Sequence, residues 1–220
     1  MNSVAALKAF CGRNNGIVCT SSNAPRAFDW AFNKGNTVFF FPDEHLGRNT
    51  ARKLGIDKSE VMLWNNTNVR RTTYDVRIIL WPGFCHVHTH FTVEDVNKMH
   101  KKHPDCKIIV HPECREEVVI AAGESGSTEE ICRFVAKQPK GATIIVGTEI
   151  NLVSRLAKEN SDKAILPLSR SLCPNMFKIS LKNLCCVLES IVEGRLVNEI
   201  VLSPEVMDDA RVALQRMLKL

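Results

Sequence analysis

Two of the nine cysteines stand where loops could bring them to a shared metal site. Cys85 and Cys173 each follow a short apolar run and a proline. Thiolate sulfur is a ligand for both zinc and iron. The chain has no Cys-x-x-Cys pair, which excludes zinc-ribbon and two-cluster ferredoxin spacings. Any metal site must therefore collect its ligands from loops far apart in the sequence.

The other cysteines are interpreted more simply. Residues 1–10 lack the basic start and long apolar stretch of a signal peptide, so we expect reduced thiols rather than disulfides. Cys114 is interpreted as a packing residue or a local redox thiol. The remaining six are expected to act as small apolar side chains: Cys11, Cys19, Cys106, Cys132, Cys185 and Cys186.

The segment Cys85-His86-Val87-His88-Thr89-His90 resembles a metal-binding tract. On a strand, its alternating histidines would point to one side, as zinc ligands need. A zinc site is thus one alternative for this segment.

Hydroxyl side chains open two predicted helices, as the pairs Ser21-Ser22 and Ser127-Thr128. The exposed N–H groups of a helix N-terminus, together with a hydroxyl, can bind an anion. Helix capping is the commoner use of such residues. Ser21 and Thr128 are therefore candidates for either role.

Alternating strands and helices must position these residues. Short β-branched or aromatic runs alternate with stretches of helical period, which predicts an α/β fold with parallel sheets. The predicted strands are Thr37–Phe41, Arg77–Leu80, Lys107–Val110, Thr143–Val146 and Ala164–Leu166. The predicted helices are Pro25–Asn33, Thr92–Lys102, Thr128–Lys137 and Leu152–Glu159.

The two halves of the chain are related by an offset of 106 residues. At this offset residues 34–38 (Lys-Gly-Asn-Thr-Val) fall on residues 140–144 (Lys-Gly-Ala-Thr-Ile), and Phe28 falls on Phe134. A single offset without a gap indicates two copies of one α/β unit. The first copy has about 18 additional residues before its cysteine, assigned to an exposed loop at Asn65–Arg71. It also lacks the opening helix and strand of the second copy, so the chain is expected to begin inside a domain.

Composition limits the classes of partner. The net charge of +5 is modest, and basic residues are scattered among acidic ones, which argues against nucleic acid. No apolar run approaches the roughly 18 residues of a membrane span. We therefore expect a cytoplasmic protein without a membrane partner.

Seven segments resemble quinolinate synthases, in the order found in that family. They are residues 19–23 (Cys-Thr-Ser-Ser-Asn), 41–48 (Phe-Pro-Asp-Glu-His-Leu-Gly-Arg), 81–85 (Trp-Pro-Gly-Phe-Cys), 110–114 (Val-His-Pro-Glu-Cys), 126–128 (Gly-Ser-Thr), 146–149 (Val-Gly-Thr-Glu) and 173–176 (Cys-Pro-Asn-Met). The resemblance covers essentially the whole chain. It is much more specific than any one motif.

The resemblance implies repeated three-layer α/β/α domains with parallel sheets, arranged with pseudo-threefold symmetry in the full-length family. It implies an enzyme that condenses iminoaspartate with dihydroxyacetone phosphate to quinolinate, in de novo NAD biosynthesis. A 4Fe-4S cluster with one open iron would bind the substrate. By motif, Cys85 and Cys173 are two of its ligands, and the third lies in a domain absent here. This ligand assignment is preferred to zinc, with His86 and His90 as variable surface residues.

The same resemblance assigns substrate contacts. His111 and Glu113 match a substrate-contacting pair that could move protons. Ser21 would hold the triose phosphate and Thr128 a substrate carboxylate, while Asn2 matches the end of a Tyr-x-Asn motif whose Tyr is absent. An enzyme that oxidises L-aspartate is the expected upstream supplier.

The domain organisation follows from the repeat and the resemblance. Residues 1–86 are predicted to be the family's second repeat domain without its first helix and strand, residues 87–173 the third, and residues 174–220 a C-terminal helical segment. The isolated chain is expected to be inactive. The alternative is a non-catalytic α/β anion-binding module without a cluster.

Overall fold

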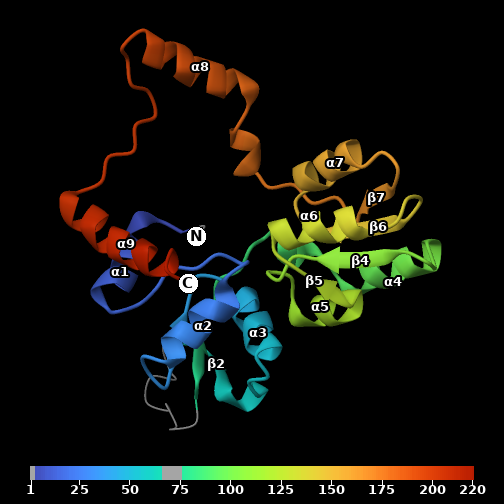
Figure 1. The fold of residues 1–220 in the computed structure, drawn as a ribbon, viewed down its shortest axis with the longest axis horizontal. Coiled ribbons are helices and arrows are strands. Elements are labelled where there is room, and N and C mark those ends of the chain that lie inside the picture. The colour runs from blue at the N-terminus through green and yellow to red at the C-terminus, as the bar shows by residue number, and fades with distance from the viewer. Residues whose placement is uncertain (1–2, 66–75) are drawn as a thin grey trace.

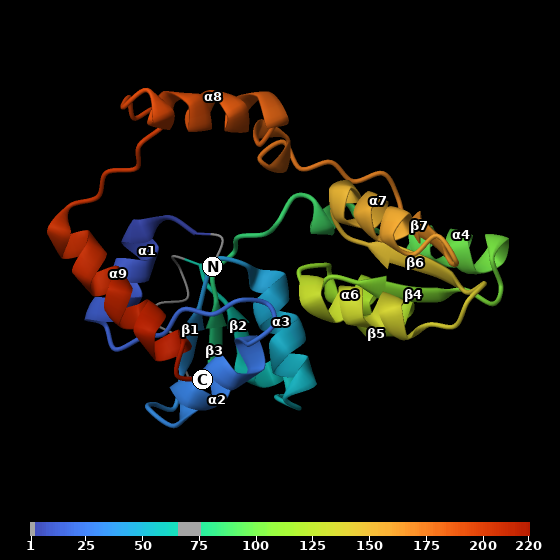
Figure 2. The same cartoon turned by 45° about the horizontal axis from the view of Figure 1, so that its top comes forward.

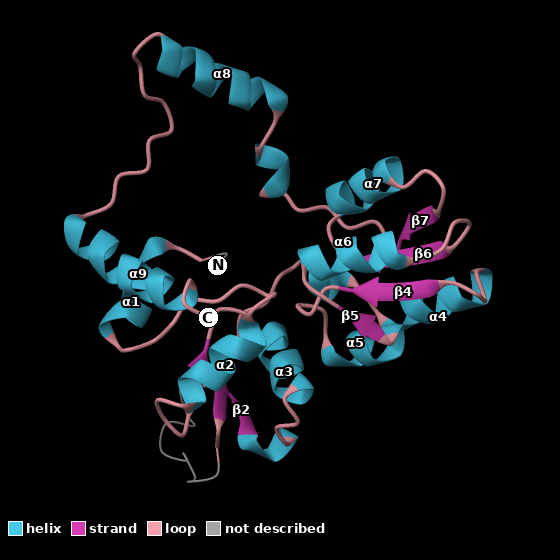
Figure 3. Ribbon diagram, viewed as in Figure 1, coloured by secondary structure: helices cyan, strands magenta, loops and turns pink. Residues whose placement is uncertain are grey.

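The computed structural model describes residues 3–65 and 76–220 and contains two parallel sheets joined by helices (Figures 1 and 3). The strands are β1 (Val38–Phe40), β2 (Val61–Leu63), β3 (Ile78–Leu80), β4 (Lys107–Val110), β5 (Glu124–Ser125), β6 (Thr143–Gly147) and β7 (Ala164–Pro167). Sheet A has the order β1-β3-β2, and sheet B has the order β5-β4-β6-β7. Every strand pair is parallel, which confirms the predicted α/β class.

Helices α1 (Ala5–Arg13), α2 (Ala24–Phe32) and α3 (Glu44–Lys53) precede or follow the strands of sheet A, together with the short helix η1 (Lys58–Glu60). Those around sheet B are η3 (His88–His90), α4 (Val93–Lys102), α5 (Glu116–Ala122), α6 (Thr128–Lys137) and α7 (Ile150–Glu159). The chain ends with η4 (Met176–Lys178), α8 (Leu181–Val192) and α9 (Pro204–Met217). None of the described helices is long and apolar enough to span a membrane.

Sheet B shows why its strands are nearly continuous apolar runs. Ile108 and Val110 of β4 pack into one cluster with residues of α4 and α5. Ile109, between them, packs on the opposite face with residues of α6 and α7. Successive strand residues point to opposite faces, so a sheet covered by helices on both sides needs apolar side chains at every position. This is the predicted three-layer arrangement.

Sheet A has a more open construction. Phe40, Ile78 and Leu80 are buried with Phe28 of α2 and Leu46 of α3. On β1 the intervening Phe39 remains 41% exposed. The described helices thus bury one face of this sheet more completely than the other.

The structure bears on the predicted duplication. At the offset of 106 residues α3 falls on α7, and β1 falls within β6. The pair β1–β3 resembles the pair β6–β7, and in each copy the second strand leads to a cysteine. The additional residues of the first copy include a strand, β2, and not only the predicted loop. Most of that loop lies outside the described residues, and the predicted domain boundaries remain a proposal.

The C-terminal segment crosses the molecule. Helix α8 stands away from both sheets, and α9 packs beside α1, near the beginning of the chain (Figure 2). The packing is close, since a Cβ atom on Gly12 would lie 1.9 Å from the carbonyl oxygen of Asp209. Cys185 and Cys186, interpreted from sequence as small apolar residues, are exposed on α8.

Candidate functional site

The candidate site lies where loops at the carboxyl ends of strands from both sheets meet. Strand β3 leads to Cys85, β4 to His111 and Glu113, and β6 to Thr148. In parallel α/β sheets, ligands bind at this end of the strands. The fold therefore places these side chains where a parallel α/β protein builds its site.

Hydrogen bonds join a helix packed on sheet A to a loop that follows a strand of sheet B. The side-chain amide of Asn49, on α3, donates to the carbonyl oxygens of Pro112 and Cys114, both at 2.8 Å. Asn49 is buried and far in sequence from the loop that it holds. The loop containing His111 and Glu113 is thereby anchored to the helix that covers sheet A.

Asp43 joins a helix to the Cys85 loop. One carboxylate oxygen accepts a hydrogen bond from the backbone N–H of Leu46 (2.7 Å), capping α3, and the other accepts from the N–H of Cys85 (2.9 Å). Burial raises the pKa of Asp43 to about 7, the two N–H donors oppose that rise, and the charge of Glu113 adds to it. Its position constrains where Cys85 can lie.

His88 is the central side chain of the site. Its Nδ1 atom lies 3.0 Å from Oε2 of Glu113, and its Nε2 atom lies 3.1 Å from Oγ1 of Thr148. Its ring stacks on that of His111, with centroids 4.2 Å apart and planes inclined by 13°. Only 8% of His88 is exposed. Contacts on three sides hold the ring in one orientation.

The two stacked histidines are electrostatically different. Burial alone would lower the pKa of His88, but hydrogen bonds to Cys85 and Glu113 outweigh it and raise the pKa to about 9. For His111, burial and the neighbouring positive charge of His88 lower the pKa to about 3. Near neutral pH the pair therefore consists of one charged and one neutral imidazole.

Glu113 completes the arrangement as a carboxylate. Burial acts to raise its pKa, but the hydrogen bond to the charged His88 outweighs burial, so the pKa is lowered. The backbone N–H of Glu113 donates to Nδ1 of His111 (3.2 Å), so this nitrogen acts as an acceptor. His111 is thus neutral with its proton on Nε2.

A metal-ligating group is present at the same place. Within the parts of the chain that the structure describes, one set of three potential ligand residues has its donor atoms within 4.8 Å of one another: Cys85, His88 and Glu113. Cys173 does not belong to this set. The zinc alternative in its original form, with histidines alternating on a strand, was wrong. His88–His90 form the short helix η3, and His86 and His90 are exposed.

A hollow connects the loops of the two candidate cluster cysteines. It has a volume of about 540 Å³ and is lined by residues that closely follow Cys85 or immediately precede Cys173: His86, Val87, His90, Arg170, Ser171 and Leu172. Both cysteines are partly exposed. Neither cysteine is itself among the residues that line the hollow.

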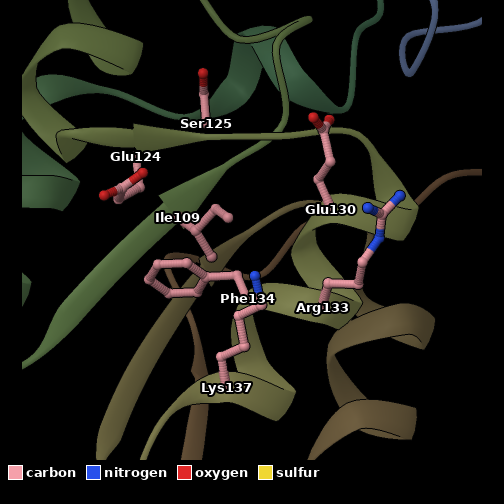
Figure 4. Close-up of a pocket in the computed structure, with 7 residues that line it drawn as sticks. All are labelled: Ile109, Glu124, Ser125, Glu130, Arg133, Phe134 and Lys137. Carbon is pink, nitrogen blue, oxygen red and sulfur yellow. The ribbon is translucent and has the colours of Figure 1, made fainter.

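A smaller hollow of about 220 Å³ lies elsewhere, between β5 and α6 (Figure 4). Glu124 on β5 and Glu130, Arg133 and Lys137 on α6 surround it. The carboxylate of Glu130 already accepts a hydrogen bond from the backbone N–H of Ser127 in the cap of α6. None of the charged side chains that line this hollow is a candidate site residue.

The remaining predicted site residues are arranged differently from expectation. Ser127, not Thr128, is the N-cap of α6, since its Oγ accepts from the N–H of Glu130. Thr128 is the first helical residue and is exposed. Ser21 lies in a turn before α2, whose N-cap is Asn23. Among the described residues, neither hydroxyl makes a side-chain hydrogen bond. Asn2 lies outside the described residues.

Cys114 is a packing residue, one of the two roles expected of it. It is fully buried, its Sγ atom lies 4.0 Å from the carbonyl oxygen of Gly147, and burial raises the pKa of its thiol. A buried, protonated thiol is inert.

The interpretation from sequence omitted His88, Asp43 and Thr148 as site residues. The signal for His88 was its place three residues after Cys85, and the signal for Asp43 and Thr148 was that both lie in segments that resemble the family.

The fold and the site define an α/β protein that gathers a thiol, imidazoles and carboxylates at the junction of two parallel sheets. A family model described as "Quinolinate synthetase A protein" matches residues 1–219. The chain belongs to this family, which confirms the resemblance inferred from its motifs.

Named relatives agree with this assignment. The chain is 47% identical to a quinolinate synthase of Corynebacterium glutamicum, covering 99% of the chain and 57% of that relative. It is 45% identical to quinolinate synthases of Rhodopirellula baltica and Bacillus cytotoxicus, of which it covers 58% and 61%. The chain thus spans about three-fifths of the length of these relatives.

Proposed function

We propose that this chain supplies part of a quinolinate synthase, which condenses iminoaspartate with dihydroxyacetone phosphate in NAD biosynthesis. The observation that carries the proposal is the gathering of His88, His111 and Glu113 beside Cys85 in a chain of this family. The proposed location is the cytoplasm. An L-aspartate-oxidising enzyme is the proposed source of the imine.

Cys85 and Cys173 would hold a 4Fe-4S cluster from this chain, with a third thiolate from the portion of the relatives that the chain does not span. When bound, the cluster would supply an open iron that acts as a Lewis acid on a carboxylate or hydroxyl of the substrate. The hollow lined by neighbours of both cysteines supports this placement.

The side chains of this chain would hold and move protons. Imine formation, enolisation and dehydration each transfer a proton to or from the substrate. The carboxylate of Glu113 can accept one, the charged His88 can donate one, and the neutral His111 can donate a hydrogen bond from Nε2 to a substrate oxygen. Paired groups whose surroundings push their pKa values apart are suited to acid and base roles. His88 is fixed by Glu113 and Thr148, so its N–H groups have defined directions.

The proposed activity is tested with the chain alone and with a chimera in which the chain replaces the matching residues of the Corynebacterium glutamicum relative. Both are loaded anaerobically with iron and sulfide and assayed for quinolinate. We expect product from the chimera and none from the chain, which offers two candidate cluster thiolates. A folded chimera without activity would contradict the proposed function. Activity from the chain alone would contradict the need for a third thiolate.

Ser21 and Thr128 are proposed to bind the phosphate of the triose and a substrate carboxylate. The N-caps of the two helices are Asn23 and Ser127, not Ser21 and Thr128. Alanine in place of Ser21 or Thr128 should therefore change the melting temperature of the chimera little while raising KM. Ser127→Ala is the matched control, since loss of a cap costs about 1 kcal/mol of stability. Unchanged KM in both Ser21→Ala and Thr128→Ala would refute the substrate roles.

A further inference from the structure

We propose that Cys85, His88 and Glu113 form a site for a single zinc ion in protein that lacks the cluster. The donor atoms of these three residues lie within 4.8 Å of one another. Around a tetrahedral zinc ion, sulfur, nitrogen and oxygen ligands stand roughly 3.3 to 3.5 Å apart. Small movements of the three side chains therefore complete the geometry.

The ligand types suit zinc. Imidazole, thiolate and carboxylate are its usual ligands, and three protein ligands with a fourth open position are typical of a reactive zinc site. The open position would take water or a substrate carboxylate. Cys85 has one thiolate, so zinc and the proposed cluster would compete for the same residue.

Neighbouring side chains hold the proposed ligands His88 and Cys85 in place, as the neighbours of metal ligands commonly do. If Nδ1 of His88 binds the ion, Nε2–H remains directed at the buried hydroxyl of Thr148, 3.1 Å away. Metal-bound histidines normally donate their second N–H to a hydrogen-bond acceptor, and the Thr148 hydroxyl can accept it. The stacked ring of His111 prevents His88 from turning, and Asp43 holds the backbone N–H of Cys85. This supporting shell is complete without the metal.

Cobalt(II) is the probe, because it occupies zinc sites and reports its ligands by absorption. Chelator-treated chain, titrated anaerobically with cobalt(II), should bind one equivalent, with a sulfur-to-cobalt charge-transfer band and strong visible bands, and zinc should displace it. Cys85→Ser should abolish the charge-transfer band. His88→Gln and Glu113→Gln should each weaken cobalt binding by at least about 10-fold.

Matched variants locate the site. Cys173→Ser, Cys114→Ser and His90→Gln should leave the cobalt spectrum unchanged. The Cys173 variant separates this site from the cluster, because it should prevent cluster formation only. A sulfur band that survives in Cys85→Ser, or is lost in Cys173→Ser, overturns the proposal.

The supporting shell is tested at Asp43. In Asp43→Ser the hydroxyl can still cap α3 at Leu46, but it leaves no second oxygen for the N–H of Cys85. Cobalt affinity should fall about 10-fold. Asp57→Ser, at the exposed cap of η1, is the control and should have no effect. Equal affinities for the Asp43 and Asp57 variants would overturn the role of Asp43.

Because variants of a buried histidine can unfold, X-ray absorption of the zinc-loaded natural sequence provides a second measurement. We expect one sulfur at about 2.3 Å, with nitrogen or oxygen at about 2.0 to 2.2 Å. A shell without sulfur, or with two sulfur atoms, overturns the assignment.

Discussion

Serine at Cys85 or at Cys173 is expected to abolish the visible iron–sulfur absorption of the reconstituted chimera, whereas serine at Cys114 should leave it intact. Cys85 and Cys173 are partly exposed on loops whose neighbouring residues line one hollow. Cys114 is fully buried, and burial disfavours the thiolate that a metal requires. Each of the three variants replaces a sulfur atom by oxygen, so they differ only in the position of the substituted cysteine.

The measurement is anaerobic reconstitution, with iron and sulfide quantified per chain alongside the visible spectrum. Cys132→Ser, at a half-buried cysteine on α6, is an additional control for general thiol loss. A full complement of cluster in Cys85→Ser or Cys173→Ser would remove that residue from the ligand set. Loss in Cys114→Ser with an unchanged melting temperature would place the cluster elsewhere.

Glutamine at His111 or Glu113 is expected to reduce quinolinate formation by the chimera by about 10² to 10⁴-fold, the usual contribution of a positioned acid or base. Glutamine keeps most of the volume of either side chain but removes the titratable group. In Glu113→Gln the loss of the negative charge also removes one of the interactions that, with the hydrogen bond to Cys85, raise the pKa of His88. Both proton-transfer partners would therefore be affected.

Quinolinate is measured at saturating substrate after cluster content has been matched between variants. His100→Gln is the control, because His100 is exposed on α4 and lies outside both the hydrogen-bonded group and the hollow. Activity within a few-fold of the natural sequence, in protein with a normal cluster, would show that His111 and Glu113 are structural residues. Loss of both cluster and activity would assign them to cluster support instead.

Much of the fold could be predicted because its signals are local. Strand β4 has the predicted bounds Lys107–Val110, and α6 has the predicted bounds Thr128–Lys137. Both depend on periodicity within a few residues, with apolar strands for a covered parallel sheet and a helix opened by a capping residue. The exposure of α8 could not be predicted this way, since burial of a helix depends on what packs against it.

The sequence by itself predicted five of the described strands to within one residue at each end, though not β2 or β5. Through its motifs it also indicated the family and the candidates Cys85, His111 and Glu113. Only the tertiary structure brought His88 against His111 and Thr148, and only it showed Asp43 reaching Cys85 across 42 residues of sequence. Hydrogen bonds of this kind depend on how two sheets are packed, which no local pattern specifies. The opposite pKa shifts of the two histidines have the same origin, because burial and neighbouring charge exist only after the loops have met.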